Sequence, residues 1–367
     1  MEYRKLGQTG MDVSALCLGT MNLGAWGNTA TEAGVGLVHH AIDCGINFID
    51  TADVYSKGQS EEIIGEALRG GLRKDVILAT KFYFSVDEGP LVKYPRPNTS
   101  GYSKRHIIAA CEASLKRLGT DWIDLYQIHE PDYTADLDEA LGALSDLVRA
   151  GKVRAIGSSS FPADLLADAH WLARARARER VRCEQPQYSI FVRTIERDVL
   201  PACQKYGLGA IVWSPLNGGW LSGARRRAEA DKGVKSRRAR LIPKMFDLGN
   251  PDNARKFDLV ESLEQLAREA GISLAQLAVA WTLEHPAVNS SIIGPRNLEQ
   301  LGALLPATTY RVPVDVLDEI DRLVPPGTIV APAADDRREV PWLKDPALRR
   351  RALPSNIPTA FNRGVQV

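Results

Sequence analysis

Four side chains that can donate, accept or hold a proton are found between positions 50 and 129: Asp50, Tyr55, Lys81 and His129. A phenol has a pKa near ~10, which is too high for an ideal proton donor at neutral pH. A lysine ammonium beside the phenol would lower this pKa, and a carboxylate beside the lysine would keep it charged and in place. Histidine can hydrogen-bond a carbonyl group and orient it. These residue types therefore predict proton delivery to a carbonyl, with hydride supplied by a bound nicotinamide.

Each of the four residues also has an ordinary explanation when it is considered alone. Asp50 could cap a turn, Lys81 could be a solvated strand end, Tyr55 could lie on the surface, and His129 could be a hydrogen-bonded structural group. Position sets them apart, because Asp50, Lys81 and His129 end successive predicted strands and Tyr55 follows the first of these ends. The proposed chemistry therefore depends on strands that bring these ends together.

Short apolar segments alternate with amphipathic segments along most of the chain. Eight of the apolar segments are predicted strands, and most are continuously apolar, which is typical of a parallel sheet covered on both faces. The predicted strands span residues 13–20, 47–52, 76–81, 123–129, 154–160, 183–189, 209–215 and 290–295.

The segments between these strands have helical signals. Thr29 and Glu32 form a capping-box pattern, and Ser60 ahead of Glu61 and Glu62 predicts a second helix start. Apolar residues repeat at helical spacing in three further segments: Ile107, Ala110, Cys111 and Leu115; Leu137, Leu141, Leu144 and Val148; and Leu259, Leu263, Leu266 and Ala270. Eight strands separated by helices predict a closed (β/α)8 TIM barrel.

A doubly wound open sheet is the structural alternative. That fold usually has a glycine-rich turn after its first strand. Gly19 and Gly24 are found there, but the GxGxxG pattern is absent. The barrel is therefore preferred, and in a barrel the loops that follow the strands form the catalytic face.

Three segments interrupt the alternation of strands and helices. Residues 82–102 and 217–251 are predicted long loops on the catalytic face, where such loops are usually functional. Residues 325–367 are rich in proline and arginine, so we predict a barrel domain over residues 1–324 and a C-terminal tail that packs on the barrel or extends from it. The basic run at 225–240 is either a solvated loop or a clamp over an anionic cofactor.

Composition argues against several classes of function. Of the 367 residues, 44% are hydrophobic, and the net charge of +1 gives no reason to expect a nucleic-acid or membrane partner. No apolar run is long enough to span a bilayer and the first residues lack a signal pattern, so we expect a cytoplasmic protein. The five cysteines are scattered without a CxxC pair, which argues against a disulfide framework or a metal site.

Several ordered motifs resemble those of one family. These are NFIDTADVYSKGQSEEIIGEAL (47–68), ATK ending at Lys81, IDLYQIHEPD (123–132), and the opening RKLGQTGMDVSALCLGTMNLG. The sequence is identified on this resemblance as a member of the aldo-keto reductase family, over residues 1 to about 305. The resemblance implies a (β/α)8 barrel preceded by an N-terminal β-hairpin, with long loops on the C-terminal face.

The same resemblance implies a role for each of the four polar residues. Tyr55 would be the general acid, Lys81 would depress its pKa, Asp50 would anchor Lys81, and His129 would polarise and align the carbonyl. Hydride would pass from the nicotinamide to the carbonyl carbon. The implied activity is NADPH-dependent reduction of aldehydes or ketones to alcohols.

A nicotinamide site is implied by three further motifs. Ser159 and Ser160 in IGSSSF would hold the carboxamide, with serine at 160 where the family usually has asparagine, and Gln185 would contact the same amide. Trp213 would stack on the ring, and Ser214 would contact the diphosphate. The remaining implied cofactor contacts in this part of the site are Gly19, Thr20, Met21, Asp50, Pro215 and Leu216.

The segment IIGPRNLEQL, residues 292–301, resembles the adenosine-phosphate site of the family, where a helix N-terminus favours phosphate. Arg296 would pair with a 2′-phosphate, and Gln300 and Gly294 would lie on the adenosine side. Arg237 in the basic loop would reinforce the preference for NADPH over NADH.

The sequence departs from the family pattern just after this segment. Ala303 and Leu304 stand where a carboxylate or amide is frequent. We therefore expect weaker or rearranged adenine contacts.

The predicted substrate pocket is aromatic and roomy. Trp26, Phe82, Tyr83, Trp220 and the 82–102 loop would line it beside Tyr55 and His129. The partner is then a small carbonyl compound, hydrophobic or glycosylated, and the chain could form a homo-oligomer.

Two other functions fit the same barrel and cofactor. One is a cofactor-bound regulatory subunit that senses redox state, as channel-associated members of the family do. The other is redox-neutral epimerisation or dehydration of a sugar. The presence of all four catalytic residue types favours the reductase.

Overall fold

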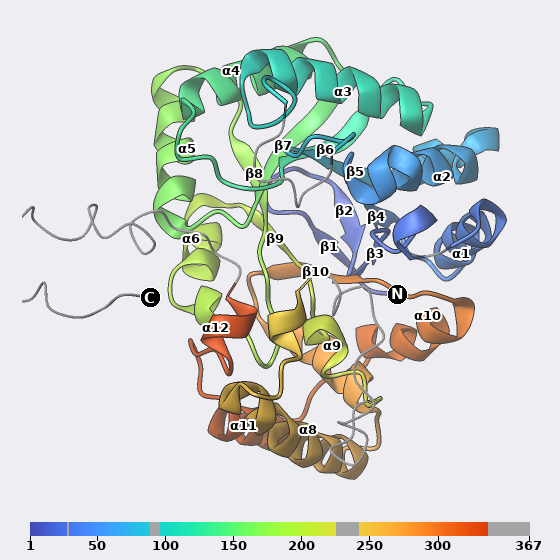
Figure 1. Ribbon diagram of the computed structural model, residues 1–367, viewed down its shortest axis with the longest axis vertical. Helices are drawn as coiled ribbons and strands as arrows, with labels where there is room; N and C mark the ends of the chain where they lie inside the picture. Colours follow the sequence, from blue (N-terminus) through green and yellow to red (C-terminus); the bar gives the residue numbers. More distant parts are fainter. Residues whose placement is uncertain (28, 89–95, 225–241, 337–367) are drawn as a thin grey trace, which may run out of the picture. The chain divides into compact units, whose positions relative to one another are not determined.

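The structure, a computed structural model, describes residues 1–27, 29–88, 96–224 and 242–336. The chain divides into a first unit, Met1–Asp336, and a second, Arg337–Val367, which lies outside the described residues. The first unit contains a closed barrel of parallel strands in the order β10-β3-β4-β5-β6-β7-β8-β9, with helices arranged around it (Figure 1). The predicted (β/α)8 barrel is therefore confirmed.

Each predicted strand corresponds to one barrel strand, with shorter or shifted bounds. The predicted 13–20 segment in fact holds parts of two strands, because Asp12–Ser14 (β2) pairs with Tyr3–Lys5 (β1) in an antiparallel hairpin. The barrel strands are β3 (Leu16–Gly19), β4 (Phe48–Asp50), β5 (Ile77–Phe82), β6 (Ile123–Ile128), β7 (Val153–Ser159), β8 (Val181–Gln185), β9 (Gly209–Val212) and β10 (Val288–Ile293).

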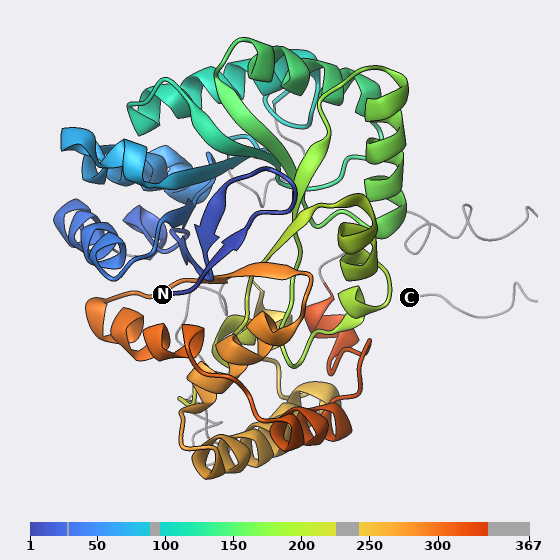
Figure 2. The ribbon, with the colours of Figure 1, turned by 180° about the vertical axis from the view of Figure 1, so that it is seen from behind.

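The hairpin lies across the N-terminal end of the barrel, in the foreground of Figure 2. Leu6 and Val13 are fully buried there and belong to the same apolar cluster as the inward-facing strand residues Cys17, Phe48 and Leu125. The hairpin thus closes the lower end of the barrel with apolar side chains, which leaves the C-terminal end for the site.

A larger apolar layer separates the outer faces of the strands from the helices. In α3 (Lys104–Leu118), the predicted apolar face is buried, including Ile107 and Cys111. The other helices are α1 (Thr31–Asp43), α2 (Gln59–Ala67), α4 (Leu137–Arg149), α5 (Ala163–Ala175), α6 (Val199–Tyr206), α8 (Pro251–Glu269), α9 (Leu274–Glu284), α10 (Leu298–Leu304), α11 (Val314–Leu323) and α12 (Pro332–Asp335).

Both predicted helix caps are wrong. Helix α1 begins at Thr31, and the Thr29 hydroxyl donates instead to the backbone oxygen of Asn22. Helix α2 begins at Gln59 after a left-handed glycine, and the Ser60 hydroxyl donates to the oxygens of Thr20. In each case a contact to the loop after β3 competes successfully with the local capping geometry.

Residues 325–336, which the sequence assigned to the tail, belong to the compact barrel unit. Ile329 forms a β-bridge with Val192. Asp335 in α12 accepts from the ammonium of Lys256 in α8 at 2.9 and 2.8 Å, and both side chains are fully buried. This buried ion pair fixes the end of the described chain to α8.

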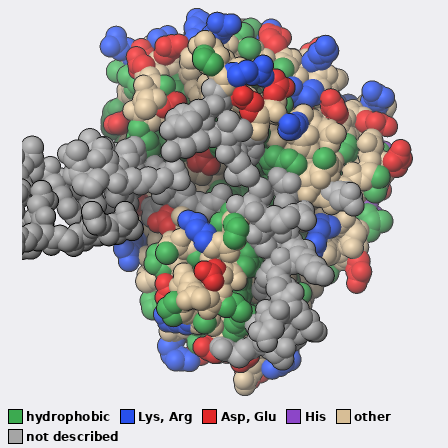
Figure 3. Space-filling view, viewed as in Figure 1, with side chains coloured by type: hydrophobic (Ala, Val, Ile, Leu, Met, Phe, Trp, Pro, Cys, Tyr) green, Lys and Arg blue, Asp and Glu red, His purple; other side chains and the backbone are tan. Residues whose placement is uncertain are grey.

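The surface has no dominant sign of charge where it is described. On the face shown in Figure 3, acidic and basic side chains are interspersed over the described atoms. Among the described residues, no helix combines the length and apolar character needed to cross a bilayer.

Candidate active site

The polar residues of the site occupy inward-facing positions near the C-terminal ends of the strands. Side chains on a strand alternate between its two faces. Phe48 and Ala79 point into the barrel, so Asp50 and Lys81, two residues further along each strand, point inward as well. The parallel register of neighbouring strands brings these ends together at one mouth.

Lys81 is the centre of the hydrogen-bonding network. Its ammonium donates to Asp50 Oδ2 at 2.7 Å, to the backbone oxygen of Thr51 at 2.6 Å and to the phenol oxygen of Tyr55 at 3.3 Å. The lysine side chain is fully buried and the aspartate side chain is 3% exposed. The three donors of the ammonium are therefore all directed at oxygen atoms.

The carboxylate of Asp50 is held from a second side. Its Oδ1 accepts from Gln185 Nε2 at 2.8 Å and from Gln127 Nε2 at 3.3 Å. A Cβ atom at Gly157 would lie 2.9 Å from the Gln127 side chain, so glycine makes room for this amide. Sequence reasoning missed Gln127, although its place on β6, two residues after the inward-facing Leu125, puts it on the inward face.

The electrostatics keep the Lys81 ammonium charged. Burial acts to lower the pKa of Lys81, but the Asp50 carboxylate and the Tyr55 phenol outweigh it and raise that pKa above its ordinary value. Because an ordinary lysine already titrates near ~10.4, the ammonium persists throughout the neutral range.

Tyr55 begins a strained turn, η2 (Tyr55–Gly58), in which Ser56, Lys57 and Gly58 have successive positive φ angles of 51°, 58° and 92°. Such conformations cost free energy for residues other than glycine and are retained where surrounding contacts impose them. Here the Ser56 hydroxyl donates to the Leu23 backbone oxygen at 2.7 Å and accepts from the Trp26 N–H at 3.0 Å. These bonds fix the tyrosine against the loop after β3.

His129 completes the group of four. Its ring centroid lies 5.8 Å from that of Tyr55, in an edge-to-face arrangement. Burial, with a contribution from the Lys81 charge, holds the pKa of His129 well below its ordinary value. Its Nδ1 atom is buried without a hydrogen-bond partner among the described residues. The imidazole is therefore neutral at physiological pH.

Aromatic side chains surround the phenol and the imidazole. The Trp26 ring lies 5.9 Å from Tyr55, and the Phe84 ring lies 5.2 Å from His129. Tyr83 packs edge-to-face on Phe84 at 5.1 Å. Phe84 was not named individually, but it lies in the 82–102 loop that was predicted to line the pocket.

Two predicted substrate contacts are wrong. Phe82 follows inward-facing Lys81 and so points outward, where it packs on Tyr126 at 4.8 Å in the layer under the helices. Trp220 is buried against Phe246 and Phe257, and its indole N–H donates to the backbone oxygen of Met245. Phe82 and Trp220 therefore contribute to packing, not to the substrate pocket.

The first set of predicted cofactor residues lies at the adjoining ends of β3 and β10. These strands are hydrogen-bonded neighbours, so Gly19, Thr20 and Met21 lie beside Gly294. The Asn22 amide donates to the Gly294 backbone oxygen at 3.0 Å and joins the two loops. Residues from opposite ends of the barrel sequence thus form one edge of the mouth.

A second set lies at the ends of β7 and β8. Ser159 donates to the backbone oxygen of Gln185 at 3.0 Å, and Ser160 has a positive φ of 61°. Asparagine adopts this left-handed region more readily than serine, which gives a physical reason for the asparagine usual in the family. The side chain of Gln185, predicted to contact the nicotinamide, also supports Asp50.

Glu184 lies directly behind these serines and is fully buried. Burial raises the pKa of its carboxyl to about 8, although it accepts from the Ser158 hydroxyl and the Phe161 N–H. The carboxyl is therefore largely protonated at neutral pH and fixes the turn that contains Ser159 and Ser160.

The third set follows β9. Trp213 packs against the apolar cluster inside the barrel, so its indole lies at the inner edge of the mouth. Ser214 has a positive φ of 63°, and its hydroxyl accepts from the Gly218 N–H, which bends the chain after Pro215 and Leu216. The turn is also held by Asn217, whose Nδ2 lies 3.5 Å from the Asp335 carboxylate.

The fourth set, at the start of α10, is exposed. The backbone N–H of Arg296 donates to Gln300 Oε1 at 3.0 Å, and the Asn297 side chain caps the helix. The guanidinium of Arg296 extends from this turn at the surface. Arg237, the other predicted phosphate contact, lies outside the described residues.

A closed barrel with an ammonium, a phenol, a carboxylate and an imidazole at its C-terminal mouth defines a TIM-barrel enzyme. Comparison with known proteins specifies the class. The aldo/keto reductase family model matches residues 15–325. The chain therefore belongs to the aldo/keto reductase family and is an oxidoreductase of that family.

Three relatives illustrate the range of the family. An uncharacterized oxidoreductase, YrpG, of Bacillus subtilis is 38% identical over 89% of this chain and 96% of its own length. A putative voltage-gated potassium channel subunit beta of Schizosaccharomyces pombe is 33% identical over 88% of this chain and 93% of its own length. Versiconal hemiacetal acetate reductase of Aspergillus parasiticus is 35% identical over 78% and 86%.

Proposed function

We propose that the protein reduces aldehyde or ketone groups to alcohols with NADPH, and that Tyr55 is the general acid. The observation that carries this proposal is the hydrogen bond from the buried Lys81 ammonium to the Tyr55 phenol, with Asp50 holding the ammonium from behind. A positive charge beside a phenol stabilises the phenolate, so the phenol gives up its proton more readily.

The surrounding residues determine the direction of proton transfer. The phenol oxygen accepts the bond from Lys81, so the phenol can donate its own proton to a carbonyl oxygen at the mouth. His129 is neutral, so one of its ring nitrogens can donate a hydrogen bond to that oxygen without competing as an acid. The positive charge of Lys81 lies behind the phenol, where it favours negative charge on the phenol oxygen.

The described residues fit a bound nicotinamide cofactor. Trp213 offers an aromatic face at the inner edge of the mouth, and the hydroxyl of Ser159 and the amide of Gln185 lie on the neighbouring strands. When bound, NADPH supplies the hydride. Arg296 supports the choice of the phosphorylated cofactor, because a guanidinium pairs with a phosphate through two parallel hydrogen bonds.

The substrate is proposed to be a carbonyl compound with an apolar or aromatic body, because Trp26 and Phe84 flank the phenol and the imidazole. We place the enzyme in the cytoplasm, a proposal supported by its five free cysteines.

The test is cofactor consumption across a panel of aldehydes and ketones. The proposal predicts that the NADPH consumed equals the alcohol formed, with both measured in the same reaction. Product without net NADPH loss would identify a redox-neutral epimerase or dehydratase instead.

A second candidate is a cofactor-bound regulatory subunit. It is favoured by relatives named as potassium channel beta subunits, including those of Oryza sativa and Arabidopsis thaliana at 34% and 32% identity. Tight NADPH binding with no multiple turnover on any member of the panel would support this candidate over the reductase.

A further inference from the structure

A cavity of about 180 Å³ opens at the N-terminal end of the barrel, several times the ~30 Å³ share of one water molecule. The turn of the N-terminal hairpin forms one wall, and the first residues of β7 and β8 form the other. The lining residues are Gln8, Thr9, Met11, Arg154, Ala155, Ile156, Glu179, Arg180 and Arg182.

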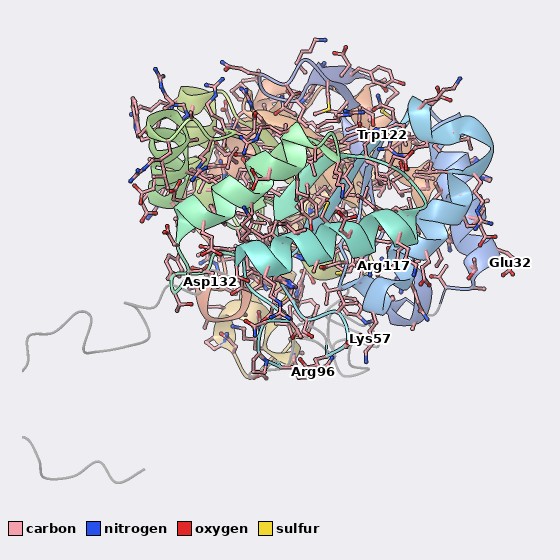
Figure 4. The ribbon with its side chains drawn as sticks, turned by 90° about the horizontal axis from the view of Figure 1, so that it is seen from above. Glu32, Lys57, Arg96, Arg117, Trp122 and Asp132 are labelled. Carbon is pink, nitrogen blue, oxygen red and sulfur yellow. The ribbon has the colours of Figure 1, made fainter. Side chains whose placement is uncertain are left out.

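This cavity is distant from the active site along the barrel axis. Figure 4 shows Trp122, just before β6, at the opposite end of the barrel unit from Lys57 and Asp132, which belong to loops at the mouth. The guanidinium carbon of Arg154 lies 5.7 Å from the Trp122 ring centroid, which places the cavity at the Trp122 end.

The charge around the cavity is unbalanced. The lining includes three arginines, Arg154, Arg180 and Arg182, and one glutamate, Glu179, which together have a formal charge of +2. In the described part of the chain, none of these four side chains forms a hydrogen bond or an ion pair within 4.0 Å. The guanidinium donors of the cluster are therefore available to an added anion.

Two arginines near the same end of the barrel have carboxylate partners. Arg73, which precedes β5, contacts Asp124 at 2.7 Å, and Arg178, two residues before the cluster, contacts Asp138 at 3.0 Å. The arginines of the cavity differ from these two neighbours, because within the described residues none of them lies within 4.0 Å of a carboxylate oxygen.

The backbone directs Arg182 into the cluster. The register between β7 and β8 shifts here, because Ile156 pairs with Val181 whereas Gly157 pairs with Cys183. Arg182 is the extra residue of this bulge. A bulge interrupts the ladder and redirects a side chain, and bulges are more frequent where that redirection is used. Burial and the neighbouring charge of Arg180 lower the pKa of Arg182, and the carboxylate of Glu179 opposes them only in part.

We propose that this cavity is a binding site for a small dianion, of which a phosphate group is the chemical type. A charge of +2 matches a dianion, and planar guanidinium groups bind tetrahedral oxyanions through paired hydrogen bonds. The volume accepts a phosphate group with a small substituent. An anion there would link the hairpin turn to β7 and β8, so binding would stabilise the folded barrel.

The experiment is calorimetric titration of the full-length protein with inorganic phosphate. The wild type is expected to bind at millimolar phosphate or below, and Arg182→Gln and Arg180→Gln are each expected to weaken binding at least tenfold, the effect of losing a hydrogen bond to a charged group. Arg176→Gln, which removes an exposed arginine outside the cavity, is the matched control and should bind as the wild type does.

A second arm separates this site from the proposed cofactor site. Arg296→Ala should bind inorganic phosphate with the same isotherm as the wild type but should bind NADPH more weakly. Absence of phosphate binding to the wild type, or equal binding by Arg182→Gln, would overturn the proposal. Loss of the phosphate isotherm in Arg296→Ala alone would assign the binding to the other end of the barrel and also overturn it.

Discussion

Replacement of Asp50 by asparagine removes the charge behind Lys81 while nearly preserving the shape of the side chain. The ammonium keeps its bonds to the Thr51 oxygen and the Tyr55 phenol but loses a charge-assisted bond of 2.7 Å. Such a bond contributes ~1.5–3 kcal/mol. If that contribution is made in the transition state, kcat/KM falls roughly 10- to 150-fold, at 1.36 kcal/mol per tenfold.

The pH dependence gives the sharper readout. Asp50 is the main group that raises the pKa of Lys81 against burial. Without it, burial favours the neutral amine, so the alkaline fall in kcat/KM should move to lower pH in Asp50→Asn. The assay is a pH–rate profile on one aromatic aldehyde with saturating NADPH, accompanied by urea unfolding.

Asp12→Asn is a matched control, because Asp12 accepts from Lys5 at the same 2.7 Å but both side chains are more than half exposed. It should cost less than ~1 kcal/mol of unfolding free energy and leave the pH profile unchanged. A wild-type rate and profile in Asp50→Asn would refute the role assigned to the buried pair.

Three further predictions concern the cofactor, the buried glutamate and the second buried ion pair. Arg296→Ala should raise the Kd of NADPH more than that of NADH, measured by fluorescence titration, and equal effects would place the 2′-phosphate elsewhere. Glu184 holds its proton in the folded state up to about pH 8, so the wild type loses stability as the pH rises from the pKa of the unfolded state toward 8. The free energy of unfolding of Glu184→Gln relative to wild type should therefore grow by up to ~1.4 kcal/mol per pH unit in that window. A difference in urea unfolding that stays constant with pH would contradict a neutral carboxyl. Lys256→Met should cost ~3–5 kcal/mol of unfolding free energy because the Asp335 carboxylate is left buried, and the double variant Lys256→Met with Asp335→Leu should recover most of it; additive losses in the double variant would show that the pair is not coupled.

The sequence predicts the barrel well because the pattern of an apolar strand followed by an amphipathic helix recurs along the chain. Most of the predicted strands are short apolar runs, and several of these runs end in polar residues. Asp50, Lys81 and His129 are found together for that reason, since parallel strands place their C-terminal ends at one mouth.

Predictions that depend on a single side chain's direction are less secure. Lys81 and Phe82 are adjacent on β5, so they cannot both face the mouth, and strict use of the two-residue alternation would have excluded Phe82 and selected Phe84. The same rule would have found Gln127. Local helix caps failed for a different reason, because Thr29 and Ser60 take partners from the loop after β3, which is distant in sequence.

Contacts between distant segments have no local signal. Asp335 and Lys256 are separated by 79 positions, and neither residue belongs to a motif. Their burial places residues 325–336 against α8, which residue periodicity cannot predict. The bulge at Arg182 also has no signal in the local sequence, because it depends on the register of the neighbouring strand.

The most direct test of the active-site account is turnover by Tyr55→Phe with NADPH binding measured on the same sample. Within the described residues, the phenol oxygen accepts a 3.3 Å hydrogen bond from Lys81, and loss of such a bond should change the free energy of unfolding by ~1 kcal/mol. The Kd of NADPH should stay within about twofold of wild type, since no cofactor contact is assigned to the phenol. Carbonyl reduction should fall by roughly 10²- to 10⁴-fold, the usual contribution of a general acid. Undiminished reduction by this variant would contradict the account.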